Sequence, residues 1–95
     1  MCYNLIELIK KHLPLLNDVE KVYVFGSILD PNKKPRDIDL LIICSEYSNT
    51  IQRQINDFEK QLEKESELSI DLTILSFEEE CQVGFLGRVS AIRLK

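Results

Sequence analysis

The stretch VFGSILDPNKKPRDIDLLII, Val24 to Ile43, carries the most informative pattern in the chain. It begins at the end of one apolar run, which closes with Gly26 and Ser27. The next apolar run opens with two aspartates, Asp37 and Asp39. An unpaired carboxylate inside a buried strand costs far more free energy than a neighbouring isoleucine or leucine returns. We therefore expect these aspartates to serve chemistry rather than packing.

Apolar runs around this stretch predict three strands. KVYVFG, residues 21–26, is short and rich in β-forming residues, so it suits a strand buried on both faces. DIDLLIIC, residues 37–44, is predicted to be the second strand, and LSIDLTIL, residues 68–75, the third.

Helices are predicted before, between and after these strands. Apolar residues recur at helical spacing in two segments: Leu5, Ile6, Ile9 and Leu13, then Ile51, Ile55, Phe58 and Leu62. They predict a helix from about Tyr3 to His12, which Pro14 ends, and a longer one from about Thr50 to Lys64. Ser76 and the acidic residues after it predict the N-cap of a third helix. Residues 84–95 fit a short helix or a strand equally well, and the order α-β-β-α-β-α indicates an α/β layer with a small sheet.

Length and composition limit the possible classes of protein. A chain of 95 residues has room for one hydrophobic core, so residues 1–95 are predicted to form a single domain. No apolar run approaches the roughly 20 residues that span a bilayer, and the first residues do not resemble a signal peptide. We therefore expect no membrane attachment and a cytoplasmic location. The net charge of -4 disfavours strong binding to nucleic acids.

Cysteine and histidine do not suggest a metal or disulfide framework. The three cysteines, Cys2, Cys44 and Cys81, are an odd number at wide spacing, which suits neither. We interpret them as buried or incidental thiols. His12 is the single histidine and comes at the predicted end of the first helix, so we interpret it as a helix residue rather than a ligand.

Strand geometry makes the aspartates informative. Residues two apart on a strand point to the same face, about 6.6 Å apart, so Asp37 and Asp39 should project together while Ile38 points the opposite way. That leaves the face of the aspartates free for chemistry. Asp71 lies in the third strand, and pairing of this strand with the second would bring three carboxylates together. Such a cluster requires a cation, and Mg²⁺ takes carboxylate oxygens together with water and substrate phosphates.

The glycine–serine pair fits the same chemistry. Gly26 would let the backbone approach a phosphate, and the hydroxyl of Ser27 can donate to phosphate oxygens. The alternative is purely structural. In that case the pair is an ordinary turn and the three aspartates are solvated strand residues.

Taken together, these motifs resemble the polymerase-beta-type nucleotidyltransferase superfamily, and most closely its minimal members. The resemblance rests on Gly26-Ser27, nine residues, the run Asp37-Ile38-Asp39-Leu40, and a later Ile70-Asp71-Leu72. It covers the chain from about Val22 to Ser76. It implies the palm-like nucleotidyltransferase fold, a small mixed sheet of three or four strands with helices mainly on one face.

The resemblance also implies roles for particular residues. Asp37 and Asp39 would hold metal ions, two Mg²⁺ ions being expected, and Asp71 would complete the site and help to activate the attacking hydroxyl. Gly26 and Ser27 match the turn that contacts the phosphates of the nucleoside triphosphate, with ATP as the expected substrate.

The chain departs from the commonest pattern of this superfamily at three positions. Asp30 and Pro31 stand where an arginine and a glycine usually follow the serine, and Arg36 replaces a small polar residue before the first aspartate. Positive charge for the triphosphate would then come from Lys33, Lys34 or Arg36. The lysines could equally be residues that keep a loop soluble.

Minimal members of the superfamily resemble the antitoxin half of two-gene modules whose toxin is a helical HEPN ribonuclease. The resemblance therefore implies transfer of a nucleotide, AMP from ATP, to a partner protein. The alternative is a catalytically impaired binding module that neutralises its partner by contact alone. A small sheet covered by two main helices should also leave apolar surface exposed, so we expect a complex with such a partner or a homodimer.

Overall fold

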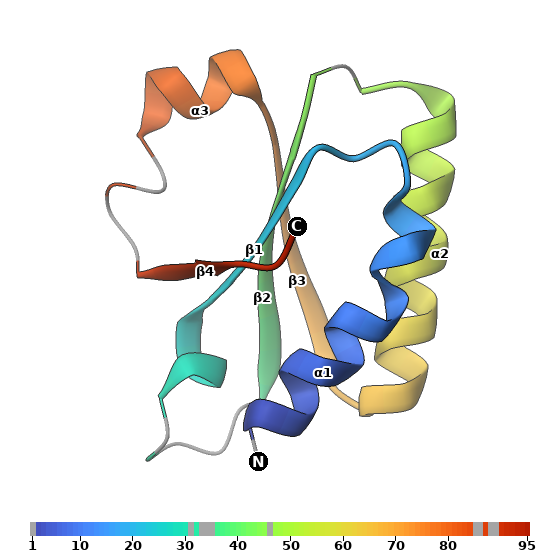
Figure 1. Ribbon diagram of the computed structural model, residues 1–95, viewed down its shortest axis with the longest axis vertical. Coiled ribbons are helices and arrows are strands. Elements are labelled where there is room, and N and C mark those ends of the chain that lie inside the picture. Colours follow the sequence, from blue (N-terminus) through green and yellow to red (C-terminus); the bar gives the residue numbers. More distant parts are fainter. Residues whose placement is uncertain (1, 31, 33–35, 46, 85–86, 88–89) are drawn as a thin grey trace.

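The computed structural model describes residues 2–30, 32, 36–45, 47–84, 87 and 90–95. In chain order its elements are α1 (Cys2–His12), the 3₁₀ turn η1 (Leu13–Leu16), β1 (Lys21–Phe25), the 3₁₀ turn η2 (Gly26–Leu29), β2 (Asp37–Cys44), α2 (Asn49–Ser66), β3 (Ser69–Ser76), α3 (Phe77–Val83) and β4 (Ala91–Arg93). The predicted helices and strands are confirmed, although α2 is longer than expected (Figure 1). The undecided C-terminal segment contains a strand, β4.

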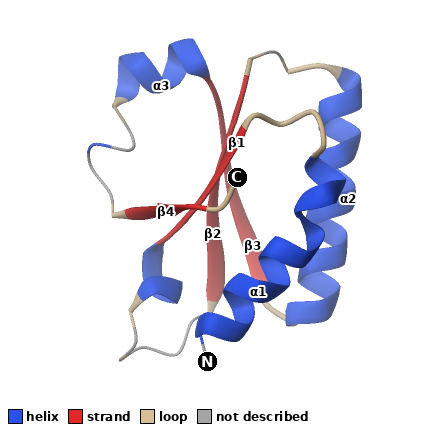
Figure 2. Ribbon diagram, in the orientation of Figure 1, coloured by secondary structure: helices blue, strands red, loops and turns tan. Residues whose placement is uncertain are grey.

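The strands form one mixed sheet in the order β3-β2-β1-β4 (Figure 2). β1 runs antiparallel to both β2 and β4, whereas β2 and β3 are parallel. Two parallel neighbours need a long crossover connection, and α2 supplies it. The structure therefore confirms the predicted α/β class with a small mixed sheet.

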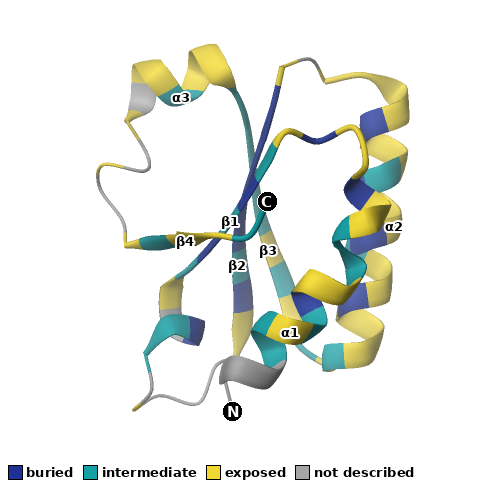
Figure 3. Cartoon of the chain, in the orientation of Figure 1, coloured by how far each residue is buried: buried dark blue, intermediate teal, exposed yellow. Residues whose placement is uncertain are grey.

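The main core lies between the sheet and the pair α1 and α2, which lie together on one side of it (Figure 3). Alternate residues of β1 and β2 face these helices and are buried: Val22, Val24, Ile38, Leu40, Ile42 and Cys44. From α2, the side chain of Phe58 is completely buried, as is Ile9 from α1. The predicted apolar face of α2 is thus the face that packs on the sheet.

Capping fixes where two of the helices begin. The Ser48 hydroxyl accepts a hydrogen bond from the Ile51 amide at the start of α2. At the start of α3, Ser76 and Glu79 form a reciprocal capping box, each side chain bonding the backbone amide of the other residue. The prediction of Ser76 as an N-cap is confirmed, because this signal depends only on residues a few positions apart.

Ion pairs and a buried thiol complete the packing of the helices. Lys11 and His12 at the end of α1 both contact Glu65 of α2, the Lys11 pair at 3.4 Å. His12 is therefore a helix residue that contacts a second helix.

Among the described residues Cys44 and Cys81 are free thiols, the first buried and the second exposed, and burial raises the pKa of Cys44. No helix in the described part of the chain is long and apolar enough to cross a membrane.

The burial of the first two strands differs from the prediction. β1 is buried on one face only, because Lys21, Tyr23 and Phe25 are half-buried on the other. β2 is instead buried on both faces beyond the aspartates, since Leu41 and Ile43 are buried opposite the main core. α3 contacts β2 and β3. A short apolar run does not reveal which of its neighbours will cover it. The prediction that β1 is buried on both faces was therefore wrong, and the face of β2 that was predicted to be free is covered beyond the aspartates.

Candidate functional site

The three aspartates lie on two adjacent strands of the sheet. In the parallel ladder Asp39 of β2 is the direct partner of Asp71 of β3, and Asp37 is the partner of Ser69. Neighbouring strands are about 4.8 Å apart, and directly paired residues share one face of the sheet. The pairing therefore brings Asp37, Asp39 and Asp71 onto the same face, as the sequence predicted.

Gly26 packs directly against this aspartate cluster. The residue has a positive φ of 83°, which side chains other than hydrogen rarely tolerate. A Cβ atom at this position would lie 2.1 Å from Oδ2 of Asp39. The turn after β1 must therefore be glycine both for its backbone conformation and for the space that the Asp39 carboxylate occupies. Sequence reasoning assigned Gly26 to the approach of a phosphate and did not predict this contact.

The electrostatics of the cluster centre on Asp39. Asp37 and Asp71 are exposed, whereas Asp39 is half-buried between them and the turn. Burial raises the pKa of Asp39, and the charges of Asp71 and Asp37, together with a side-chain hydrogen bond to Asp71, raise it further. Holding all three carboxylates ionised is therefore unfavourable, and a cation bound here would relieve the repulsion.

Metal binding by the cluster stays a prediction. No group of three or more His, Cys, Asp or Glu side chains in the described part of the chain is placed so that it could hold a metal ion. Mg²⁺ usually takes only one or two protein carboxylates and completes its coordination with water and substrate phosphates. The paired carboxylates of Asp39 and Asp71, with Asp37 on the same face, match this donor set.

The other predicted site residues are placed less completely. Gly26 and Ser27 open the turn η2, and Arg36 is exposed immediately before β2. Lys33 and Lys34 lie outside the described residues, so their predicted contact with phosphates stays a prediction.

Asp30, which replaces the usual arginine, takes part in a local turn. Its Oδ1 accepts a hydrogen bond of 2.9 Å from the backbone amide of Asn32. Asp and Asn side chains often stabilise turns in this way. The carboxylate therefore has a structural role in the loop that leads from η2 to β2.

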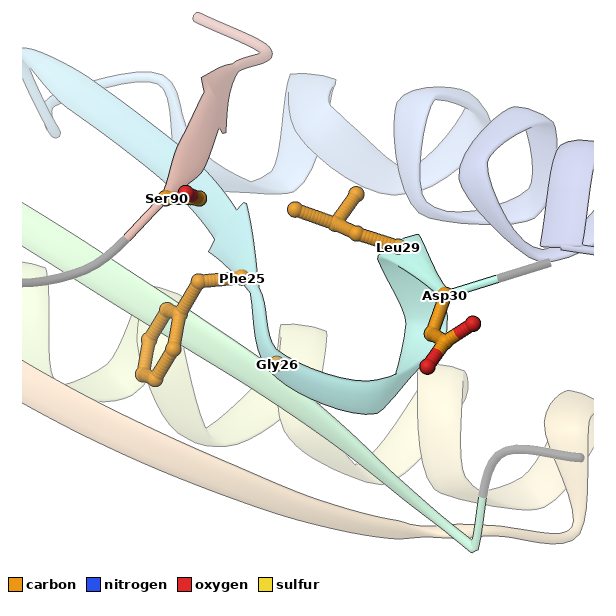
Figure 4. A pocket seen from close by; sticks show the side chains of 5 residues that line it. All are labelled: Phe25, Gly26, Leu29, Asp30 and Ser90. Carbon is orange, nitrogen blue, oxygen red and sulfur yellow. The ribbon is translucent and has the colours of Figure 1, made fainter. Parts of the chain in front are cut away.

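A hollow of about 430 Å³ lies beside the Gly26 turn and was not predicted. It is lined by Phe25, Gly26, Leu29, Asp30 and Ser90 (Figure 4). Leu29 points across the hollow toward Ser90, which precedes β4, whereas Asp30 points away from it. Because Phe25 is the ladder partner of Asp39, the hollow and the aspartate cluster share the end of β1. Nothing in the sequence links Ser90 to this region.

Comparison with known proteins identifies a family that the chain matches. The family model described as Polymerase beta, Nucleotidyltransferase matches residues 4–88. No curated protein matches the chain.

Several solved structures share the fold. One is a complex of the tri-AMPylated HEPN toxin of Shewanella oneidensis with its MNT antitoxin; the match has 18% identity and a TM-score of 0.63 and covers 100% of this chain and 72% of that chain. A candidate nucleotidyltransferase from Sulfolobus solfataricus matches with 18% identity, a TM-score of 0.61 and coverage of 97% and 80%. A mutant MntA–HpeT toxin–antitoxin complex matches with 13% identity, a TM-score of 0.57 and coverage of 100% and 73%.

These identities are low, so the solved structures establish the shared fold and nothing further. The family model, in contrast, matches most of the chain, including β1, the turn after it and all three aspartates. The chain therefore belongs to the polymerase beta nucleotidyltransferase family.

Proposed function

We propose that the chain is a Mg²⁺-dependent nucleotidyltransferase that transfers AMP from ATP to a partner protein. The observation that carries this proposal is the pairing of Asp39 with Asp71 beside the Gly26 turn. This arrangement brings the three carboxylates together, and burial and the charges of Asp71 and Asp37 disfavour ionisation of Asp39. A site that binds divalent cations together with a triphosphate accounts for a cluster that is otherwise unfavourable.

Each aspartate has a role in the proposed reaction. Asp37 and Asp39 would hold Mg²⁺, which when bound neutralises the charge of the triphosphate and of the departing pyrophosphate. Asp71 would accept the proton of the attacking hydroxyl group. The hydroxyl oxygen forms a bond to the α-phosphorus of ATP as the bond from that phosphorus to the bridging oxygen breaks. Pyrophosphate leaves, and AMP stays attached to the acceptor.

Positive charge for the triphosphate would come from the loop between η2 and β2. Asp30 occupies the usual place of an arginine, so Lys33, Lys34 and Arg36 are the basic residues between the Gly-Ser turn and the aspartates. Replacing both lysines by alanine should weaken ATP binding without changing its dependence on Mg²⁺. Unchanged affinity in calorimetry would assign both lysines to the solvated loop.

We further propose that the chain acts as an antitoxin in the cytoplasm. Two of the structural neighbours are toxin–antitoxin complexes, and one of these toxins carries AMP. The other complex carries two aspartate-to-glutamate substitutions two positions apart, the same spacing as Asp37 and Asp39 here. Large apolar side chains are also exposed in the described part of the chain: Leu15, Tyr47, Phe77 and Ile92. A helical toxin of the HEPN type is the partner that these observations favour over a homodimer.

A second function is a binding module without catalysis. It is favoured by Asp30, which places a negative charge where a triphosphate would need a positive one. Such a module would neutralise its partner by contact alone.

One experiment separates these two functions. The purified chain is incubated with Mg²⁺, labelled ATP and the product of the neighbouring gene, and the intact masses are measured. A gain of one AMP moiety or more on the partner, lost with Asp37→Asn and kept with the exposed helix variant Asp57→Asn, supports the transferase. A tight complex without any change of mass supports the binding module.

A further inference from the structure

The outer edge of β3 has no strand partner among the described residues. β3 is the last strand of the sheet, and all eight of its residues pair with β2 on one side. In a parallel ladder, successive residues direct their backbone N–H and C=O groups alternately to the two sides of the strand. About half of the backbone polar groups of β3 therefore point outward and can pair with a further strand.

The sequence of this edge has few of the features that usually prevent such pairing. Exposed edge strands are usually protected by proline, lysine, a bulge or very short length. β3 contains neither proline, glycine nor lysine, and its pairing with β2 continues without a bulge from Ser69 to Ser76. Its one charged residue is Asp71, which belongs to the aspartate cluster. The edge is therefore long, regular and continuous with the candidate site.

Acidic side chains flank this edge on the helical side of the sheet. Gln54 and Glu65 lie on the flank of α2 that faces η1 and α1, since they contact Asp18 and Lys11. At about 100° per residue, the opposite flank of the helix carries Glu59 and Glu63. That flank faces outward beyond β3, because α1 lies on the other side of α2. A strand added to β3 would meet these glutamates over one face and Asp71 on the other.

These charges disfavour a second copy of the chain as the added strand. Two β3 strands that pair antiparallel about a two-fold axis keep both α2 helices on the same side of the joined sheet. The acidic flank of one α2, which carries Glu59 and Glu63, would then face the acidic flank of the other. Like charges placed opposite each other in this way are destabilising. A basic strand from a different protein complements the edge instead.

We propose that the edge of β3 binds an extended, basic segment of the protein partner by adding it to the sheet as a fifth strand. Rows of backbone hydrogen bonds would hold the segment, and its lysine or arginine side chains would meet the acidic flanks. The inference rests on the proposed function, because the segment that binds here brings a residue to about 4.8 Å from the backbone of Asp71. A serine, threonine or tyrosine at that position is presented to the aspartate cluster. The acceptor is thus a strand-like segment that carries a hydroxyl group between basic residues.

Amide hydrogen exchange followed by NMR tests this docking directly, without ATP or metal. The probe is an eight-residue peptide of alternating lysine and valine with one central tyrosine. We expect alternate amides of Ser69–Ser76 to exchange rapidly in the free chain and to slow at least about tenfold when peptide is added, because an amide bonded in a ladder exchanges only through opening. Exchange that stays unchanged at millimolar peptide overturns the inference. Edge amides that are already protected in the free chain, with protection rising as the chain is concentrated, identify a second copy as the occupant and also overturn it.

Two further controls test the hydrogen bonds and the charges. Two peptides, each N-methylated at one of the two alternating sets of residues, should differ in their affinity for β3, because only one set of backbone N–H groups can donate to β3. Glu63→Lys should weaken binding about threefold or more, whereas the exposed α2 variant Asp57→Lys, with the same change of charge, should have a smaller effect. Equal binding of a peptide with glutamate in place of lysine contradicts the proposed charge preference.

The outcomes separate this inference from the proposed function. Docking is measured without nucleotide, so Asp37→Asn should leave it unchanged while it abolishes transfer of AMP. Transfer without protection of β3 would retain the transferase and reject the edge as the docking site. Protection of β3 without transfer would retain the edge as the docking site and reject the transferase.

Discussion

Replacing Gly26 by alanine tests the contact on which the geometry of the candidate site depends. The backbone of Gly26 has a φ of 83°, and the added Cβ would lie 2.1 Å from Oδ2, 3.0 Å from Cγ and 3.2 Å from Cβ of Asp39. The methyl group and the carboxylate cannot both keep these positions, so Asp39 must rotate away. Gly26→Ala should therefore destabilise the domain and displace the aspartate at the same time.

The expected loss can be divided into two parts. A left-handed backbone costs an alanine about 1–2 kcal/mol relative to glycine. Moving the side chain of Asp39 away from its preferred rotamer adds about 0.5–1.5 kcal/mol. Gly84→Ala is the matched control, because Gly84 has a positive φ of 61° but no atom within 4 Å of the added Cβ. It should lose the backbone part alone.

Thermal and urea unfolding of both variants measure the difference. One kcal/mol shifts the melting temperature of a domain of this size by about 4–8 °C, so Gly26→Ala should melt lower than Gly84→Ala by about this amount. Combining Gly26→Ala with Asp39→Ala should recover the part that is due to the clash, giving a coupling of about 1 kcal/mol. If the two glycine variants lose equal stability and the double variant is additive, Asp39 does not pack against Gly26.

Three more variants test the electrostatics and the core. Because the pKa of Asp39 is raised in the native state, this residue favours folding most when it is protonated at low pH, and that contribution is lost as the pH rises through the native pKa. Without metal, Asp39→Asn should therefore exceed wild type in stability most clearly near neutral pH. Urea unfolding at a series of pH values measures this difference. Desolvation alone would raise the pKa of Glu65, but the charges of His12 and Lys11 outweigh it and lower the pKa, so its contribution is lost as the pH falls through the native pKa. Wild type should accordingly lose more stability than Glu65→Gln between about pH 6 and about pH 3, and equal losses would contradict the ion pairs. Phe58→Ala, at a completely buried position, should cost about 3–5 kcal/mol in urea unfolding, and a loss below 1 kcal/mol would contradict the described core.

Helix and strand identities could be predicted because their signals are local. The buried stripe of α2 is set by residues three and four positions apart, and the start of α3 by Ser76 and Glu79. The alternation that points Asp37 and Asp39 to the same face also follows from neighbours on one strand. C-terminal residues 84–95 lacked such a signal, since β4 is three residues long and exists by pairing with β1.

Burial of the strands could not be predicted in the same way. Leu41 and Ile43 continue an apolar run and are buried on the same side of the sheet as the aspartates. Tyr23 and Phe25 belong to an equally apolar run and remain half-buried. Which face is covered depends on elements far away in the chain, and these leave no mark in the strand itself.

The sequence by itself determined the family signature: a glycine–serine turn, an aspartate pair at fixed spacing and a third aspartate in a later strand. The tertiary structure decided that Asp39 pairs with Asp71, that Gly26 leaves room for the Asp39 carboxylate, and that the outer edge of β3 pairs with no other strand of the described residues. The physical reason is range. Turn residues, caps and alternation are fixed by interactions between near neighbours in the chain, whereas the register of two strands and the exposure of an edge arise only when distant segments pack around a common core.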